Sequence, residues 1–169
     1  MKNNKPVIFI SHIHEAEQLA KTLKDLISEI FPDFIEIFVS SDESSISLGD
    51  EWAIKIDGNL RTCDMMLILC SEQSLTRPWI GFEAGVGWAK EIKVIPLCYD
   101  GLAIKDLPSP FNRWQGANLN RLDSISKLIK QTARRYDLPL NESNAQSTLN
   151  LYHGIIKKLA DNEYRVSGF

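Results

Sequence analysis

One acidic side chain in this chain stands in surroundings that could support catalysis. Glu83 lies in the stretch T-R-P-W-I-G-F-E-A-G-V-G-W-A-K, residues 76–90, among apolar residues and with no basic residue adjacent. Trp79 precedes it by four residues, so on a helix the indole ring and the carboxylate would share one face. The stretch also carries three glycines, each of which weakens a helix by about 0.5–1 kcal/mol relative to alanine. We therefore expect something, either backbone or ligand, to approach this helix closely.

A purely structural role for this helix stays open. Pro78 suits a first helical turn, where a missing N–H group is tolerated, and Thr76 is the expected cap. In this interpretation the helix packs on a sheet and Glu83 lies at its solvent edge. Trp79 would then be an ordinary core residue, as we expect for Trp52 and Trp88.

Several other kinds of site do not fit the sequence. There is no G-x-x-x-x-G-K-[ST] phosphate-binding loop and no G-x-S-x-G nucleophile motif. Gly85 and Gly87 imitate half of a dinucleotide-binding fingerprint, but Lys90 stands where the third glycine belongs. His12 and His14 lack a third ligand, and the three cysteines have no metal-ligand spacing, so we predict no metal site.

A single carboxylate is sufficient for one class of reaction, the cleavage of an N-glycosidic bond whose leaving group is already good. Ordinary glycosidases need two carboxyl groups because the leaving alcohol must be protonated. Nicotinamide leaves NAD⁺ as a neutral molecule from a cationic pyridinium, so no general acid is required. Glu83 could orient the ribose through its hydroxyl groups and stabilise an oxocarbenium-like centre by its charge.

Composition sets limits on the fold and on the partners. With 169 residues, 44% of them apolar, the chain can bury one core, and one folded domain is expected. A net charge of −3 indicates no general affinity for nucleic acid. There is no run of about 18 apolar residues and no signal peptide, so we expect a cytoplasmic protein that does not bind membranes.

Short apolar runs alternate with helical periodicities along the chain. Strands are expected at Pro6–Ser11, Phe34–Ser40, Asp64–Cys70, Lys93–Tyr99 and Gln115–Leu119, with Pro96 indicating an edge or bulge position. Helices are expected over His14–Phe31, from Asp50 through Trp52 and Ile56 to Leu60, from Thr76 to Lys90, over Arg121–Tyr136 and from Leu149 to Leu159, the last after a linker, Leu138–Ser143. This alternation predicts an α/β fold, a flavodoxin-like open parallel sheet of four to five strands with helices on both faces.

The same topology predicts where a ligand would bind. In open α/β sheets, ligands bind beyond the carboxyl ends of the strands. Those ends are Ser11 with His12, the polar loop of residues 40–49, Ser71–Thr76 and Tyr99–Leu102. The polar loop and the start of the Glu83 helix would therefore face one cleft.

Three stretches, in this order, resemble the sequence boxes of TIR (Toll/interleukin-1 receptor) domains. Val7–His12 looks like the first box, and S-S-D-E-S-S-I-S-L-G-D-E-W resembles the BB loop. R-P-W-I-G-F-E-A-G-V-G-W-A-K resembles the W-x-x-x-E segment of bacterial TIR enzymes. The resemblance covers about Lys5 to Tyr136 and implies the TIR fold. It favours a TIR domain over residues 1–137, with 138–169 as a linker and C-terminal helix leading to a further domain in a longer protein.

The resemblance also implies an activity and its residues. In this family the glutamate of the W-x-x-x-E segment, here Glu83, is the catalytic residue of NAD⁺ cleavage. NAD⁺ would be the substrate, with no additional cofactor. Bacterial members often act in antiviral defence and work as assemblies, so self-association through TIR–TIR contacts and a nucleotide-sensing partner are expected. The implied substrate-binding residues are Ser11, His12, Asp42, Ser47, Leu48, Gly49 and Trp79.

Two other functions stay open. Many TIR domains are adaptors that only assemble with other proteins, although adaptors generally lack the glutamate. A nucleoside deoxyribosyltransferase-like enzyme is also α/β with a catalytic glutamate on an E-x-G helix, but the BB-like loop argues against it. The sequence leaves open whether water or an adenine nitrogen captures the reacting centre, and so whether the product is linear or cyclic ADP-ribose.

Overall fold

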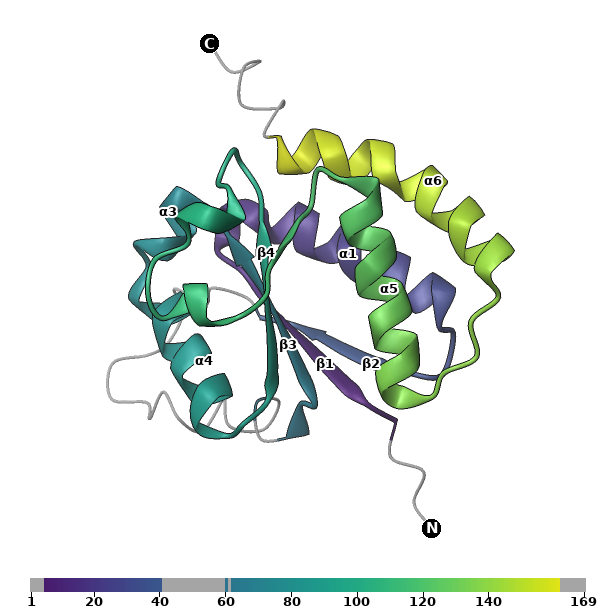
Figure 1. The fold of residues 1–169 in the computed structure, drawn as a ribbon, viewed down its shortest axis with the longest axis horizontal. Helices are drawn as coiled ribbons and strands as arrows, with labels where there is room; N and C mark the ends of the chain where they lie inside the picture. The colour runs from purple at the N-terminus through teal and green to yellow at the C-terminus, as the bar shows by residue number, and fades with distance from the viewer. Residues whose placement is uncertain (1–4, 41–59, 61, 162–169) are drawn as a thin grey trace.

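A parallel β-sheet forms the centre of the structure, a computed structural model that describes residues 5–40, 60 and 62–161 (Figure 1). Within those residues it has five strands in the order β2-β1-β3-β4-β5, and every neighbouring pair is parallel. The strands are β1 (Val7–Ser11), β2 (Glu36–Val39), β3 (Met65–Cys70), β4 (Lys93–Cys98) and β5 (Ala117–Asn118). The predicted open parallel sheet is confirmed, and each strand begins and ends within two residues of its expected bounds.

β3 shows why these residues form a central strand. Its sequence is M-M-L-I-L-C, and every one of these side chains is buried. A strand covered on both faces needs apolar residues throughout, which is the pattern of an internal parallel strand. β3 pairs with β1 through Ser11 and Ile68 at one end, and with β4 as far as Cys70 and Cys98.

Pro96 lies within β4 at a point where its missing N–H group does no harm. The carbonyl of Cys98 accepts from the Leu119 amide on the β5 side, and backbone groups alternate between the two sides of a strand. The nitrogen of Pro96 therefore also faces β5, which begins to pair only at Leu97. β4 is an internal strand of the sheet, but no described strand pairs with it on the β5 side at Pro96. Pro96 therefore has the edge position that the sequence predicted.

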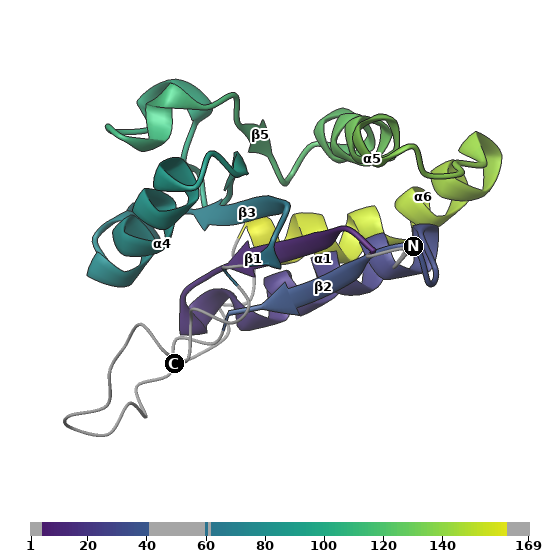
Figure 2. The same ribbon diagram turned by 90° about the horizontal axis from the view of Figure 1, so that it is seen from below.

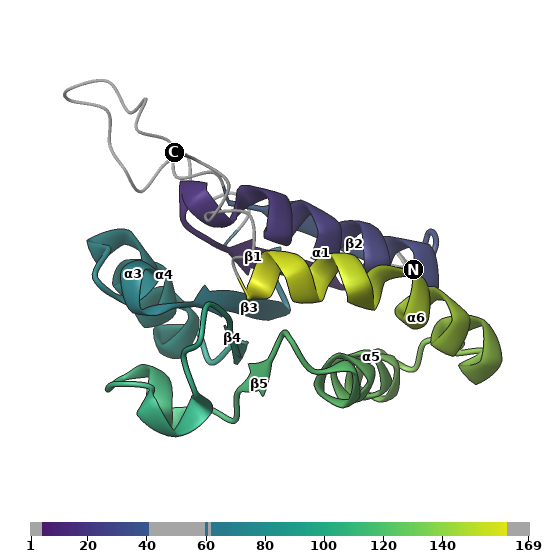
Figure 3. The ribbon, with the colours of Figure 1, turned by 90° about the horizontal axis from the view of Figure 1, so that it is seen from above.

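Helices cover both faces of the sheet. α3 (Glu72–Leu75) and α4 (Pro78–Ala89) lie on one face, and α1 (Glu17–Ile30), α5 (Leu122–Tyr136) and α6 (Glu142–Ala160) lie on the other (Figure 1). α1 and α6 lie against each other along much of their length (Figures 2 and 3). Three short 3-10 helices complete the described part: η1 (His14–Ala16), η2 (Ile104–Asp106) and η3 (Phe111–Arg113).

α1 and α5 are amphipathic helices of the predicted kind. Each buries one stripe of side chains at helical spacing and exposes charged residues opposite. The buried residues are Leu19, Ala20, Thr22, Leu23, Leu26 and Ile27 in α1, and Ile125, Leu128, Ile129, Thr132 and Ala133 in α5. No helix among the described residues is long and apolar enough to span a lipid bilayer.

The last helix begins earlier than predicted. The sequence suggested a linker through Ser143, but α6 starts at Glu142, because the Asn141 side chain caps it by accepting from the Asn144 amide at 3.0 Å. At its other end, the carbonyl of Ala160 accepts from the Asp100 amide at 2.5 Å. The division into residues 1–137 and 138–169 stays a prediction.

The helices expected from Thr76 and from Asp50 differ in how the structure describes them. Thr76 does not cap the Glu83 helix; it ends the short helix α3, and the N-cap of α4 is Arg77, without a side-chain cap. The sequence did not predict α3, although Ser71 and Ser74 form a capping box at its start. Of the helix predicted from Asp50 to Leu60, the structure describes Leu60, which is buried; the rest, Trp52 included, lies outside the described residues.

Candidate functional site

The carboxyl ends of four parallel strands meet at one edge of the sheet and bring polar side chains together. Ser11 ends β1, Ser40 follows β2, Ser71 follows β3 and Tyr99 follows β4. Hydrogen bonds join neighbouring strand ends: the His12 amide donates to Ser40 Oγ at 3.1 Å, and the Ser71 hydroxyl donates to the Tyr99 oxygen at 3.1 Å. This edge is the place where the topology predicted a ligand site.

Glu83 reaches this edge from α4 and meets the end of β1. The Ser11 hydroxyl donates a hydrogen bond to Glu83 Oε2, although the two residues are 72 positions apart in the sequence. Both side chains are 0% exposed. The interpretation of Glu83 as a carboxylate at the solvent edge is therefore wrong, because the helix carries it inward.

The inward position of Glu83 follows from the packing of α4. Glu83 shares the buried face of the helix with Ile80, Ala84 and Gly87. A Cβ atom at Gly87 would lie 2.8 Å from Val94 Cγ2, so only glycine lets the helix approach the sheet this closely. The expectation of close approach is thus confirmed at Gly87.

The other two glycines of α4 do not fit that expectation. A Cβ atom added at Gly81 or Gly85 would meet no described heavy atom within 4 Å. These two positions are exposed. Close approach of described backbone or side chains therefore explains one of the three glycines that marked this helix in the sequence.

A fully buried carboxylate points to a functional role for Glu83. Burying an ionised carboxyl group carries a large desolvation penalty, which hydrogen bonds offset only in part. An apolar side chain of the same size would fill this place beside the sheet without that penalty. Packing alone therefore does not explain a glutamate here, and the donor from Ser11 holds one carboxylate oxygen in a fixed direction.

His12 lies beside this pair with its ring oriented by the backbone. Its side chain is 1% exposed, and Nδ1 lies 2.6 Å from the carbonyl oxygen of Ile13. Because a carbonyl oxygen only accepts, Nδ1 carries a hydrogen in this contact. The structure places His12 at the site as expected, and its role as a substrate contact stays a prediction.

Trp79 lies near the start of α4 and is half-buried. Its ring stacks on Phe82, with the ring centroids 5.5 Å apart and the planes inclined by 25°. Phe82 is 47% exposed, so this aromatic pair reaches the surface of the helix rather than the centre of the core. Trp88, near the other end of α4, is 58% exposed, so the expectation that it is a core residue is wrong. The pocket wall and the core residue both remain open as roles for Trp79. The remaining predicted substrate contacts, Asp42, Ser47, Leu48 and Gly49, lie outside the described residues.

Sequence reasoning missed a cluster of side chains at the rim of this edge. Glu15 in η1 accepts hydrogen bonds from Gln73 in α3 and from Arg77 at the start of α4. No local pattern signals this cluster, since its members are separated by about sixty residues. Tyr99 was expected only as part of a strand end, and burial raises the pKa of its phenol, so the hydroxyl stays protonated.

The cysteines take no part in this site. Cys63, Cys70 and Cys98 are free and buried. Burial raises the pKa of the Cys63 and Cys98 thiols to about 11 and raises that of Cys70 as well. The thiols are thus protonated near neutral pH, and the protonated form is a poor nucleophile. Among the residues the structure describes, no group of three or more His, Cys, Asp or Glu could hold a metal ion.

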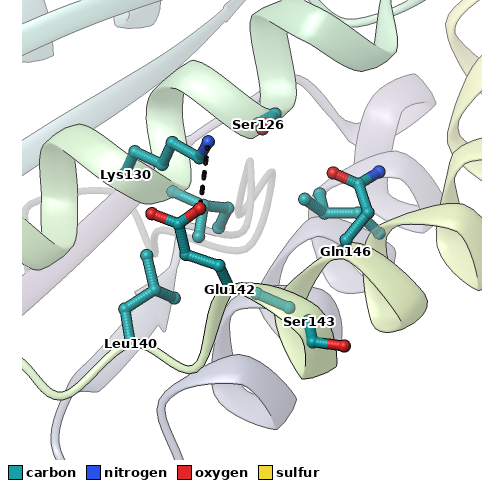
Figure 4. Close-up of a pocket in the computed structure, with 9 residues that line it drawn as sticks. Ser126, Lys130, Leu140, Glu142, Ser143 and Gln146 are labelled. Carbon is teal, nitrogen blue, oxygen red and sulfur yellow. Dashed lines mark ion pairs between the residues drawn. The ribbon is translucent and has the colours of Figure 1, made fainter.

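Two cavities lie away from this edge, beside α6. One, of about 300 Å³, lies between α5 and α6, and two of its lining residues, Lys130 and Glu142, form an ion pair at 3.8 Å (Figure 4). The other, of about 710 Å³, is lined by residues from the end of α1, from the segment before α6 and from α6 itself. Neither is lined by a candidate site residue.

The match of the chain to a protein-family model agrees with this fold. A family model described as the TIR domain matches residues 8–132. Among solved structures, the TIR domains of the activated Roq1 resistosome, which directly recognizes the pathogen effector XopQ, match with a TM-score of 0.42 and 14% identity. That match covers 93% of this chain and 84% of the other. No curated protein sequence matches the chain.

Proposed function

This chain belongs to the TIR domain family, and we propose that it cleaves the bond between nicotinamide and ribose in NAD⁺, with Glu83 as the catalytic residue. The observation that carries the proposal is the buried Glu83 carboxylate, held by the Ser11 hydroxyl at the carboxyl edge of the sheet. The products are nicotinamide and either ADP-ribose or a cyclic isomer of ADP-ribose.

The chemistry needs one carboxylate and no cofactor. The glycosidic C–N bond breaks, and its electron pair neutralises the pyridinium nitrogen, so nicotinamide leaves without taking up a proton. The ribose carbon becomes oxocarbenium-like, and the Glu83 charge stabilises it while a carboxylate oxygen accepts from a ribose hydroxyl. Water then attacks that carbon and releases a proton, or an adenine nitrogen attacks it and closes a ring.

Ser11 positions the carboxylate in this scheme. Its hydrogen bond to Oε2 fixes the direction in which the carboxylate faces the substrate. Trp79 would stack on the nicotinamide ring and His12 would contact the nucleotide, together with the further contacts predicted from the sequence. A stacked aromatic ring contributes about 0.5–2 kcal/mol to the binding of a cation.

Full burial of Glu83 also supports control of the activity by assembly. Solvent does not reach the carboxylate in this state, so substrate entry requires a rearrangement at the edge of the sheet. We propose that self-association shifts the population toward an open, competent state, as a ligand does in any two-state protein. The specific activity would then rise with protein concentration.

The biological setting follows from the family resemblance rather than from the geometry. We propose that the protein acts in the cytoplasm in bacterial antiviral defence and that a nucleotide-sensing partner domain or protein triggers its assembly. Neither nucleic acid nor a membrane is needed as a direct partner in this scheme.

One observation favours a second function, that of a non-catalytic interaction module. Phe82 and Trp88 are 47% and 58% exposed on α4, and Glu83, the one charged residue of that helix, is buried. An uncharged, aromatic helix face is suited to contact with another protein. In such a module, Glu83 would serve the assembly with other proteins rather than catalysis.

Chromatography of NAD⁺ after incubation with the purified protein separates these functions. The proposal predicts release of nicotinamide together with linear or cyclic ADP-ribose. An interaction module would leave NAD⁺ intact at every protein concentration. A deoxyribosyltransferase-like enzyme would ignore NAD⁺ and exchange the base of a deoxynucleoside supplied with a second free base.

A further inference from the structure

We propose that Glu15 is a positioning residue that holds the two halves of the catalytic pair together. Glu15 Oε1 accepts from Arg77 Nη2 at 2.7 Å and from Gln73 Nε2 at 3.0 Å. It thereby joins η1, which follows β1, to α3 and to the residue that precedes α4. The catalytic part of this inference rests on the proposed function of Glu83.

The contact lies close in the chain to both members of the pair. Glu15 follows Ser11 by four residues, and Arg77 precedes Glu83 by six. The Ser11 hydroxyl at the end of β1 bonds directly to Glu83 Oε2, so the direction of the carboxylate depends on how the segment from β1 to η1 lies against α4. The rim contact joins η1 to the start of α4, and the buried contact joins the end of β1, which η1 follows, to the middle of α4.

The start of α4 needs such a contact. Arg77 is the N-cap residue, and no side chain caps the helix there. Pro78 supplies no N–H group; the Ile80 amide donates to the Arg77 carbonyl at 3.2 Å, and the Arg77 amide donates to the Ser74 carbonyl at 3.0 Å. The bridge from Glu15 to the Arg77 guanidinium adds an attachment to η1, an element outside the helix.

The bridge is placed to affect geometry more than stability. Its side chains are 32% exposed for Glu15 and 40% for Arg77, and ion pairs this open to solvent contribute little to global stability. A catalytic group is more sensitive, since a displacement of about 1 Å can lower a rate by about a hundredfold. Loss of the bridge should therefore lower kcat with little change in folding.

Variants of this bridge test the inference against a matched control. Glu15→Ala removes the acceptor, and Glu15→Gln keeps an amide oxygen in its place. Glu17→Ala is the control, because it removes another exposed ion pair, to Lys21 at 2.6 Å, that does not reach α4. We expect Glu15→Ala to lower kcat about tenfold with KM changed less than about twofold and the melting temperature within about 2 °C. Glu15→Gln should recover part of the rate, and Glu17→Ala should match the wild type.

Amide hydrogen exchange gives a readout that does not depend on NAD⁺ cleavage. We expect Glu15→Ala to speed exchange in residues 12–16 and 79–83, and the Glu17→Ala control to leave both segments unchanged. If the wild type does not cleave NAD⁺, the proposed function fails, and the exchange experiment still decides the positioning role. Unchanged exchange in both segments would overturn the inference, as would a Glu15→Ala variant with normal kcat or with a change in KM alone.

Discussion

Replacing Ser11 with alanine removes the hydroxyl that donates to the buried Glu83 carboxylate. A hydrogen bond to a charged group contributes about 1.5–3 kcal/mol, and no solvent reaches this site to replace the lost donor. For a domain of this size, each 1 kcal/mol shifts the melting temperature by about 2–4 °C. Ser11→Ala should therefore lower the melting temperature by about 3–12 °C, measured by thermal melts followed by circular dichroism.

Ser40→Ala is the matched control for this prediction. The Ser40 hydroxyl is also at the carboxyl edge, but it accepts from the neutral His12 amide at 3.1 Å. A neutral hydrogen bond contributes about 0.5–1.5 kcal/mol, so Ser40→Ala should be the milder change. In steady-state kinetics Ser11→Ala should also lower kcat, because the carboxylate loses its fixed direction.

A double-mutant cycle with Glu83→Gln isolates the contribution that the negative charge of Glu83 makes to its hydrogen bond with Ser11. In the glutamine background Ser11 faces a neutral amide oxygen, so Ser11→Ala should cost about 1 kcal/mol less there than in the wild type. Urea denaturation of the four proteins gives the coupling free energy. Additive effects within about 0.5 kcal/mol, or equal losses for Ser11→Ala and Ser40→Ala, would refute the reasoning.

Two further predictions concern packing and pH. In urea denaturation, Gly87→Ala should destabilise the fold by about 1–3 kcal/mol, because its Cβ would lie 2.8 Å from Val94 Cγ2. Gly85→Ala should instead stabilise the fold by about 0.5–1 kcal/mol, because its Cβ would meet no described heavy atom within 4 Å. Equal effects of the two substitutions would contradict this packing of α4. Burial raises the pKa of Cys63 and Cys98 from 9.0 to about 11, so the unfolded state releases these protons first and their contribution to stability is lost as the pH rises from about 9 to 11. Replacing both cysteines with alanine should flatten urea-denaturation stability over that pH range, and an unchanged slope would count against the burial of these thiols.

The sheet and its main helices could be predicted because local sequence determines them. A run such as M-M-L-I-L-C suits a strand buried on both faces, and the apolar spacing of α1 and α5 has one helical period throughout. Parallel topology places the strand ends at one edge, so the sequence predicts that Ser11 and the start of the Glu83 helix lie at the same edge of the sheet. It did not predict their hydrogen bond, because contacts between residues 72 positions apart depend on how the helix packs.

Other features depended on interactions that leave little local signal. Thr76 looked like a cap because it stands two residues before Pro78, but α3 occupies the preceding turn and Thr76 ends it. Nothing in the local sequence distinguishes Gly81 and Gly85 from Gly87; the difference is that Gly87 is buried against Val94 and Met66 in the fold.

The central claim is that the Glu83 carboxylate cleaves NAD⁺, and the most direct test is nicotinamide release by the wild type and by Glu83→Gln. The substitution keeps the size of the side chain and an oxygen that can accept from Ser11, but it removes the charge. Glu72→Gln is the control, because it neutralises an exposed glutamate on the neighbouring helix α3. With folding checked by circular dichroism, we predict that the wild type and Glu72→Gln release nicotinamide and that Glu83→Gln loses this activity by about a hundredfold or more. A folded Glu83→Gln variant with near-normal release, or a wild type that leaves NAD⁺ intact across the concentrations where it self-associates, would contradict the claim.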